Sequence, residues 1–155
     1  MQSTIEIRSD DLSGDATRRL VAFHLAALRG TAPPESVHAL DVDALRRPGI
    51  SVWSAWAEDR IAGIAALREL AADRGEIKSM RVDDGFRGAG VGRALLEHVV
   101  RSARERGMTS LWLETGTTED FAPAHRLYES AGFVDCEAFE GYRPDPHSRF
   151  MTLTL

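Results

Sequence analysis

The feature that most constrains this chain is a glycine-rich turn at residues 87–93, between a predicted strand and a predicted helix. Residues 76–82 have the composition of a strand, and residues 94–105 form a long amphipathic pattern. Backbone N–H groups at a helix N-terminus attract anions, and glycine lets an anion approach because it has no Cβ. The turn therefore predicts a cradle for a phosphate or pyrophosphate. The residues assigned to it are Arg87, Gly88, Ala89, Gly90, Val91, Gly92 and Arg93.

Two familiar nucleotide-binding motifs fail on spacing. Gly85 and Gly90 have the spacing of a P-loop, but Val91 and Gly92 follow where that motif needs lysine and then serine or threonine. A dinucleotide fingerprint that starts at Gly88 needs glycine where Arg93 stands, and one that starts at Gly90 needs glycine where Leu95 stands. The pattern that does fit is R-x-x-G-x-G, with its arginine at position 87.

A second motif lies downstream, A-x-x-L-Y-x-x-x-G-F from Ala124 to Phe133. With both motifs, the chain resembles the GNAT superfamily of acetyl-CoA-dependent N-acetyltransferases over residues 50–155, and by pattern alone before that. Segments 113–116, 121–124 and 142–151 are similar to those of a bacterial subgroup of small acetyltransferases, whose acceptors are mostly undefined. The resemblance implies that the turn holds the pyrophosphate of coenzyme A. Phe121 departs from the family, since many relatives have asparagine there to bind the cofactor.

The resemblance also implies a cleft between two strands that separate. The backbone of Met80 and Val82 would then pair with the pantetheine arm of acetyl-CoA, and Arg81 is either a further contact or an ordinary residue of the sheet face. Tyr128 stands where relatives point a hydroxyl at the thioester sulfur. Its alternative is a tyrosine packed on the helix with its hydroxyl in solvent.

Acetyl transfer to an amine needs a group that accepts a proton from the ammonium. Glu76 stands at the position of the general base in some relatives, and Glu114 at the end of the next strand is its rival. Each is otherwise a surface or ion-paired glutamate. Because strand side chains alternate, we expect two sets on opposite faces. One set is Glu76, Lys78, Met80 and Val82, and the other is Ile77, Ser79 and Arg81.

The predicted fold class is α/β, a GNAT-type mixed and mostly antiparallel central sheet flanked by helices. We expect Asp15 to cap the first helix and Pro33–Pro34 to open a second helical region through Leu45. Strands are expected at 5–8, 50–57, 60–67, 76–82, 109–114, 133–139 and 150–155, and helices at 16–28, 34–45, 94–105 and 121–131. His24 is expected to be a packed histidine, and Cys136 a buried strand residue.

Composition agrees with one domain over residues 1–155, since 43% of the 155 residues are hydrophobic and 28% charged. The net charge of −5 argues against a nucleic-acid surface. Nothing resembles a signal peptide or membrane span, and the single cysteine fits reducing cytoplasm, the expected location. His98 and His125 have no metal-ligand partner at helical spacing, so no metal is expected. The sequence leaves open whether the chain forms a homodimer.

The function predicted is transfer of acetyl from acetyl-CoA, as co-substrate, to a primary amine of a small molecule by direct attack in a ternary complex. Two alternatives stay open: an acyl-CoA-binding regulatory module with little or no catalysis, and an acetyltransferase of protein N-termini or lysines. The proline-stiffened loop 140–148 is expected near the acceptor, where Tyr142 and Arg143 would shape the site and Arg143 would suit a carboxylate. Its alternative is a purely structural connection.

Overall fold

The computed structural model describes residues 4–155, and its centre is one seven-stranded sheet. The strand order is β1-β2-β3-β4-β5-β7-β6, and of the strand pairs in these described residues only β4 and β5 are parallel. The strands are β1 (Ile5–Ser9), β2 (Ile50–Ala57), β3 (Arg60–Ala71), β4 (Arg74–Val82), β5 (Ser110–Gly116), β6 (Val134–Asp135) and β7 (Ser148–Thr154). This confirms the predicted mixed, mostly antiparallel fold.

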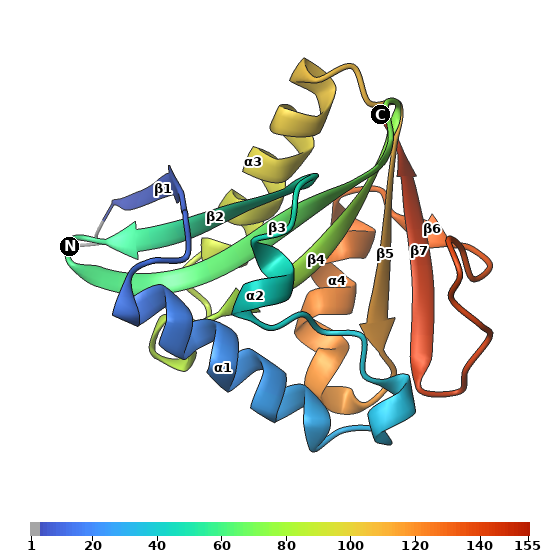
Figure 1. Cartoon of the computed structure of the whole chain (residues 1–155), viewed down its shortest axis with the longest axis horizontal. Coiled ribbons are helices and arrows are strands. Elements are labelled where there is room, and N and C mark those ends of the chain that lie inside the picture. Colours follow the sequence, from blue (N-terminus) through green and yellow to red (C-terminus); the bar gives the residue numbers. More distant parts are fainter. Residues whose placement is uncertain (1–3) are drawn as a thin grey trace.

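Helices cover both faces of the sheet (Figure 1). They are α1 (Asp15–Arg29), α2 (Val42–Leu45), α3 (Val91–Glu105) and α4 (Ala122–Ser130), with single 3₁₀ turns at Pro34–Ser36, Asp84–Phe86 and Glu119–Phe121. None of the helices in residues 4–155 is long and apolar enough to cross a membrane.

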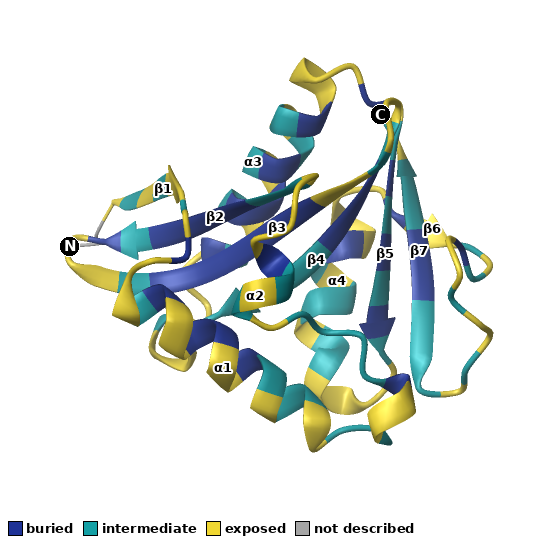
Figure 2. Cartoon of the chain, viewed as in Figure 1, coloured by how far each residue is buried: buried dark blue, intermediate teal, exposed yellow. Residues whose placement is uncertain are grey.

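Two apolar clusters hold these layers together. The larger joins α3 and α4 to one face of the sheet through residues such as Leu95, Val99 and Leu111, each 0% exposed. The smaller joins α1 and α2 to the other face through Leu20, Leu45 and Ile64. Helices are buried where they meet the sheet and exposed on their outer sides (Figure 2). Burial of these apolar faces is the main force that stacks helices on a sheet.

The parallel pairing of β4 with β5 ends halfway along both strands. It runs from Arg74–Ser110 to Ile77–Leu113, whereas β4 continues to Val82 and β5 to Gly116. The two strands move apart beyond that point, toward the lower edge of Figure 1. One edge of β4 after Ile77 therefore has no strand partner in the described part of the chain, and an opening forms inside the sheet.

A β-bulge at Ser79 lies at the start of this opening. Lys78 and Arg81 pair with Ala66 and Ile64, so β4 has one residue more than β3 between these pairs, and Ser79 has a left-handed φ of 54°. The expected alternation is therefore wrong after Lys78. Arg81 shares the α1 face with Lys78.

Met80 and Val82 pack instead with the larger cluster, on the face covered by α3 and α4. An extra residue in a strand exchanges the two faces, because the side-chain period is two residues. The bulge thus separates the side chains of Lys78 and Arg81 from those of Met80 and Val82.

The local predictions were least accurate where distant segments meet. Asp15 begins α1 and Gly14 caps it, although Gly30 ends the helix as expected. Between Pro34 and Leu45 there are only one 3₁₀ turn and the short α2. The expected strand at 133–139 shrinks to Val134–Asp135, so Cys136 follows the strand and is half-buried.

Both misassigned segments pack against each other, and these contacts decide their conformation. The Ser36 hydroxyl donates a hydrogen bond to Asp145 at 2.5 Å, and the ring of His38 meets that of Tyr142 edge-on at 4.9 Å. The segments that carry these residues, 33–41 and 136–147, therefore lie side by side, with the 3₁₀ turn Pro34–Ser36 as their one regular element.

Candidate active site

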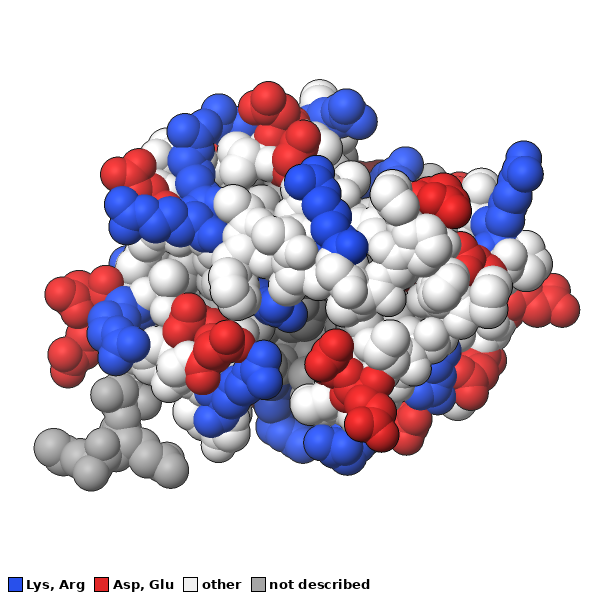
Figure 3. Space-filling model, turned by 90° about the horizontal axis from the view of Figure 1, so that it is seen from below, with Lys and Arg blue, Asp and Glu red and all other residues white. Residues whose placement is uncertain are grey.

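The opening between β4 and β5 forms a cleft that reaches both faces of the sheet. Its walls come from α1, the segment 33–41, the two separated strands and the start of α4. The lining residues used below are His24, Glu76, Lys78, Ser79, Met80, Glu114, Phe121 and Tyr128. Seen from below Figure 1, at the end where the strands part, the surface is hollowed near its centre, with Lys or Arg atoms inside the hollow (Figure 3). The expected cleft is thus present in the described part of the chain.

The predicted cradle has the geometry that an anion site needs. Gly88 and Gly90 have left-handed φ values of 77° and 81°, and Gly90 caps the N-terminus of α3. A Cβ at either glycine would meet no atom within 4 Å, so the space in front of the turn is open. Helix N-terminal N–H groups next to open space suit a phosphate group. The turn therefore fits the pyrophosphate of coenzyme A.

The two arginines that flank the cradle are both on the surface. Arg87 pairs with Asp84 at 2.7 Å and remains 69% exposed, and Arg93 is also exposed. An exposed pair of this kind contributes little to stability. Arg87 is therefore available to exchange its carboxylate partner for a phosphate.

Tyr128 projects from α4 into the cleft and is 5% exposed. Its ring packs on Phe133 at 5.8 Å, and no hydrogen bond to its hydroxyl is found within residues 4–155. Burial, and secondly the charge of Glu114, raise the pKa of this phenol above its usual value. The hydroxyl therefore stays protonated at neutral pH and can donate a hydrogen bond to a group in the cleft.

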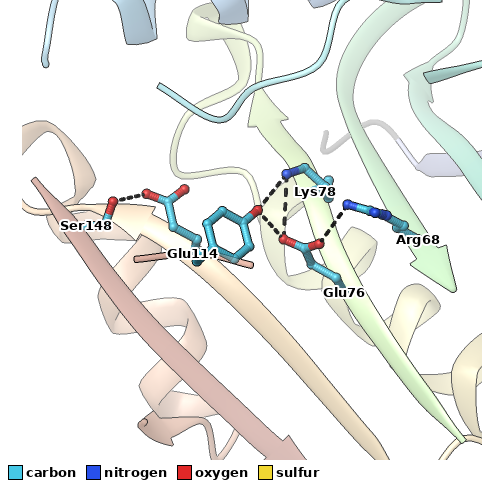
Figure 4. Close-up of polar contacts among 6 residues, drawn as sticks. Arg68, Glu76, Lys78, Glu114 and Ser148 are labelled. Carbon is cyan, nitrogen blue, oxygen red and sulfur yellow. Dashed lines mark hydrogen bonds and ion pairs between the residues drawn. The ribbon is translucent and has the colours of Figure 1, made fainter. Parts of the chain in front are cut away.

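Glu76 lies on β4 and is almost completely enclosed, with 1% of its surface exposed. The Tyr142 hydroxyl donates a hydrogen bond to its Oε2 at 2.5 Å, and Lys78 Nζ lies 3.6 Å from the same oxygen. Arg68 lies 3.8 Å from Oε1, and Lys78 also donates to the Tyr142 hydroxyl at 2.8 Å. Dashed lines in Figure 4 mark these contacts. Two cations and a hydroxyl thus already surround this carboxylate.

Glu114 lies on β5, across the opening from Glu76, and has a much simpler environment (Figure 4). Its side chain accepts one hydrogen bond, from the Ser148 hydroxyl at 2.7 Å. Burial raises the pKa of this carboxyl, and the Ser148 hydrogen bond only partly opposes that effect. A cleft carboxylate with a raised pKa and few partners is typical of a group that exchanges protons.

The structure also places three other residues that the sequence analysis named, Arg143, Phe121 and His125. Arg143 is exposed and does not line the cleft, whereas Tyr142 of the same loop reaches Glu76. Phe121 lines the cleft and covers Gly116, where an added Cβ would come within 2.1 Å of its ring. His125 bonds the Gly116 carbonyl at 2.8 Å and so ties α4 to β5.

His24 is 7% exposed, as expected for a packed histidine. Within residues 4–155 no cluster of three or more metal-ligating side chains is found. Sequence reasoning missed Lys78, whose role depends on Tyr142, a residue 64 positions away. No local signal connects the two.

Comparisons with known proteins agree with this geometry. The model of the acetyltransferase (GNAT) family matches residues 17–133. The uncharacterized N-acetyltransferase YedL of Escherichia coli is 46% identical over 96% of this chain and 94% of its own length. The uncharacterized N-acetyltransferase YsnE of Bacillus subtilis is also 46% identical, over 97% of this chain and 100% of its own length. An IAA acetyltransferase of Azospirillum brasilense is 38% identical over 79% of this chain and 80% of its own length.

Solved structures share the fold. A Klebsiella pneumoniae protein described as an acyl-CoA N-acyltransferase has a TM-score of 0.80 at 26% identity and covers 98% of both chains. The ribosomal-protein-S18-alanine N-acetyltransferase of E. coli has a TM-score of 0.70 at 23% identity, over 97% and 94%. A B. subtilis acetyltransferase in complex with CoA has a TM-score of 0.67 at 19% identity, over 98% and 99%.

Proposed function

We propose that this chain, which belongs to the acetyltransferase (GNAT) family, transfers acetyl from acetyl-CoA to the primary amine of a small molecule by direct attack in a ternary complex. The family and its N-acetyltransferase relatives make the chain an acyltransferase. The observation that carries the finer proposal is that Glu114 and Tyr128 line one cleft inside the sheet, close enough for the charge of Glu114 to raise the pKa of Tyr128. A proton acceptor and a hydroxyl donor thus stand at the same opening.

Glu114 serves as the general base in this proposal. An amine must lose a proton before its nitrogen can form the new C–N bond, and an ionised carboxylate in reach, directly or through one water, can accept that proton. Within residues 4–155 only the Oε2 of Glu114 accepts a hydrogen bond, from Ser148, so its other oxygen is open to this role. Glu76 is less suited, because it is 1% exposed and Tyr142 and Lys78 contact its Oε2. Its Oε1 has no hydrogen-bond partner within residues 4–155 but is buried 3.8 Å from Arg68. We assign Glu76 the task of positioning Lys78 and Tyr142.

Tyr128 stabilises the leaving sulfur. When the C–S bond breaks, the electron pair stays on sulfur, and a hydrogen bond from the Tyr128 hydroxyl offsets the charge. A thiol has a pKa of about 8.5, well below that of a buried tyrosine, so complete proton transfer from Tyr128 to the thiolate is unfavourable. Tyr128 therefore acts chiefly by donating a hydrogen bond, and the proton that the sulfur finally takes comes from solvent.

Acetyl-CoA, when bound, supplies the activated acetyl group. The positive φ values of Gly88 and Gly90 and the open space in front of them support a site for its pyrophosphate at the turn 88–92. The free edge of β4 beyond Ile77 leaves the backbone of Met80 and Val82 available to the pantetheine arm. Their side chains support this edge by packing toward α3 and α4.

A small acceptor is favoured by the cover over the α1 side of the cleft. The segments 33–41 and 136–147 are tied together by the Ser36–Asp145 hydrogen bond, and residues of both line the cleft. Such a cover leaves little room for a folded protein. The alternative of a protein N-terminus as acceptor is supported by the shared fold with the ribosomal-protein-S18-alanine enzyme. The cytoplasmic location stays a prediction.

A panel of amines tests the proposal directly. Purified protein is incubated with acetyl-CoA and single small amines, amino acids or peptides, and release of free thiol is followed. We expect saturable turnover with at least one small amine and at most weak turnover with peptides. Tight coenzyme A binding without turnover would favour the binding-module alternative, and preference for peptide N-termini would favour the protein acceptor.

A further inference from the structure

Four buried side-chain atoms have no hydrogen-bond partner within residues 4–155. One is an acceptor, Glu76 Oε1, which lies 3.8 Å from Arg68. The other three are His24 Nδ1 on α1, and Ser79 Oγ and Arg81 Nε on β4. The great majority of buried polar side-chain atoms in proteins are hydrogen-bonded, so a group of such atoms needs a physical reason. All three can donate a hydrogen bond: the arginine always, serine through its hydroxyl, and histidine in one tautomer.

These groups lie around one part of the cleft. His24 and Ser79 both line it, and His24 is 7% exposed. Arg81 does not itself line the cleft, but its charge is close enough to lower the pKa of His24, and its guanidinium lies 5.2 Å from the ring of Phe23. The Ser79 bulge creates this arrangement, because it puts Arg81 on the same face of the sheet as α1.

The charge at this place is positive and the histidine is neutral. Burial, and secondly the nearby charge of Arg81, lower the pKa of His24 to about 4, so His24 is an uncharged donor or acceptor at neutral pH. The other charged groups of the cleft are Glu76, Lys78 and Glu114, and Glu76 already contacts Lys78. Arg81 therefore places a positive charge beside His24, with the carboxylates of Asp84 and Asp120 also near it. The carboxylate of Glu114 lies on β5, on the other side of the cleft.

We infer that His24, Ser79 and Arg81 form a subsite for a carboxylate carried by the acceptor amine, an inference that rests on the proposed function. His24 and Ser79 donate hydrogen bonds to the carboxylate oxygens, and Arg81 supplies the positive charge beside them. The amine of the same molecule then faces Glu114. This replaces Arg143, which is exposed outside the cleft, as the recognition element for an acidic acceptor.

A carboxylate fits these groups better than a phosphate. The subsite offers one full positive charge, because Lys78 is already engaged by Glu76 and the Tyr142 hydroxyl. A phosphate monoester carries close to two negative charges at neutral pH, and the carboxylates of Glu76 and Glu114 in the same cleft repel the second one. A monoanion is therefore the better match.

Matched pairs of acceptors test the subsite. Amino acids are compared with their amides and with amines that lack the carboxyl group, and phosphoethanolamine is included as the phosphate arm. We expect kcat/KM for the best amino acid to exceed that for its amide by tenfold or more. In His24→Phe this ratio should fall to near one through a higher KM for the amino acid, with the amide unaffected.

A matched control is available in His98→Phe. His98 lies on α3 and packs on Trp53, and it does not line the cleft. This variant should keep the wild-type preference. Equal kcat/KM for amino acids and amides in the wild-type protein, or an undiminished preference in His24→Phe, overturns the subsite while leaving the acetyltransferase proposal intact. If phosphoethanolamine is a better acceptor than the amino acids, the subsite binds a phosphate and not a carboxylate.

A binding measurement does not depend on turnover. Coenzyme A-loaded protein is titrated calorimetrically with N-acetyl amino acids and their amides, which resemble the expected products. We expect the carboxylate forms to bind at least tenfold more tightly, and Ser79→Ala and Arg81→Met to weaken that binding. If none of the carboxylates binds better than its amide, the donors are satisfied by water alone and the subsite is wrong, even if uncharged amines are acetylated.

Discussion

The two halves of the cleft are built in opposite ways. The half next to α3 and α4 consists mainly of backbone: a glycine turn, a helix N-terminus and a free strand edge. The side chains of Phe121, Ala124 and Tyr128 complete it. The half next to α1 consists of side chains from α1, the segment 33–41, both separated strands and the loop 136–147. Backbone recognition suits a co-substrate that a whole family shares, whereas side chains suit an acceptor that differs between relatives. A change in one half should leave binding in the other half unaltered.

The largest effect is expected where the two halves meet, at Glu114. Glu114→Gln should lower kcat by about 100-fold or more, because removal of a general base costs about that much. The rise of wild-type turnover with pH through the raised pKa of Glu114 should disappear in this variant. Turnover measured over pH, side by side with Glu76→Gln, checks this. If only Glu76→Gln changes the pH profile, Glu76 is the base, and if neither does, another group serves the amine.

Thermal unfolding provides the control for Glu114→Gln. The folded-state pKa of Glu114 is raised, so its stabilising contribution is complete below the unfolded pKa and is lost as pH rises through the folded pKa. At neutral pH the buried carboxylate therefore costs stability. Glu114→Gln should unfold at the same or a higher temperature than the wild type at pH 7, with the difference shrinking in acid. A lower Tm at pH 7 would mean that the lost activity reflects lost structure.

The next largest effect is expected at Tyr128. Tyr128→Phe should lower kcat by about 10- to 100-fold, since a hydrogen bond to a charged group contributes about 1.5–3 kcal/mol. The binding of acetyl-CoA should change little, because the thiolate charge develops only during the reaction. Steady-state kinetics together with a coenzyme A titration separate these two quantities. Unchanged kcat would leave Tyr128 as a packing residue of α4.

A smaller effect, confined to the co-substrate half, is expected at Gly90. A Cβ there occupies the open space in front of the turn, so Gly90→Ala should weaken coenzyme A binding by about tenfold or more, equal to about 1.4 kcal/mol. Gly107→Ala is the matched control, because Gly107 has a φ of 83° and equally open surroundings but follows the other end of α3. Similar losses in both variants would point to backbone strain and not to a blocked cradle.

The smallest effect, confined to the acceptor half, is expected at Tyr142. Tyr142→Phe keeps the ring that packs on Phe139 and Phe150 but removes the hydrogen bonds to Glu76 and Lys78. We expect a loss of about 1–2 kcal/mol in the free energy of unfolding. The KM for the acceptor should rise a few-fold at an unchanged Kd for coenzyme A. Denaturant unfolding and a coenzyme A titration check both, and a weakened Kd would show that the halves are coupled.

Local sequence determined the glycine turn and the helix of the co-substrate half, but not the face of Met80 and Val82, which the bulge at Ser79 exchanges. A strand, a glycine turn and a helix follow one another within residues 74–105, and their geometry depends on backbone conformation and short-range hydrogen bonds. The same holds for β2, whose observed bounds Ile50–Ala57 match the predicted ones, and for α4, which is followed by Gly132 with a φ of 100°. Such features are encoded by residues next to each other, so pattern and motif predicted them.

Only the tertiary structure decided which side chains meet in the acceptor half of the cleft, next to α1. The bulge at Ser79 has no clear mark in the sequence EIKSMRV, yet it moves Arg81 to the α1 face. Tyr142 engages Glu76 from 66 residues away, and this contact, not the position of Glu76 in its strand, distinguishes the two glutamates. The sequence alone determined which residues can donate, accept or carry charge. Their partners depend on long-range packing, which lets Ser36 meet Asp145 and leaves His24 Nδ1 without a hydrogen-bond partner among residues 4–155.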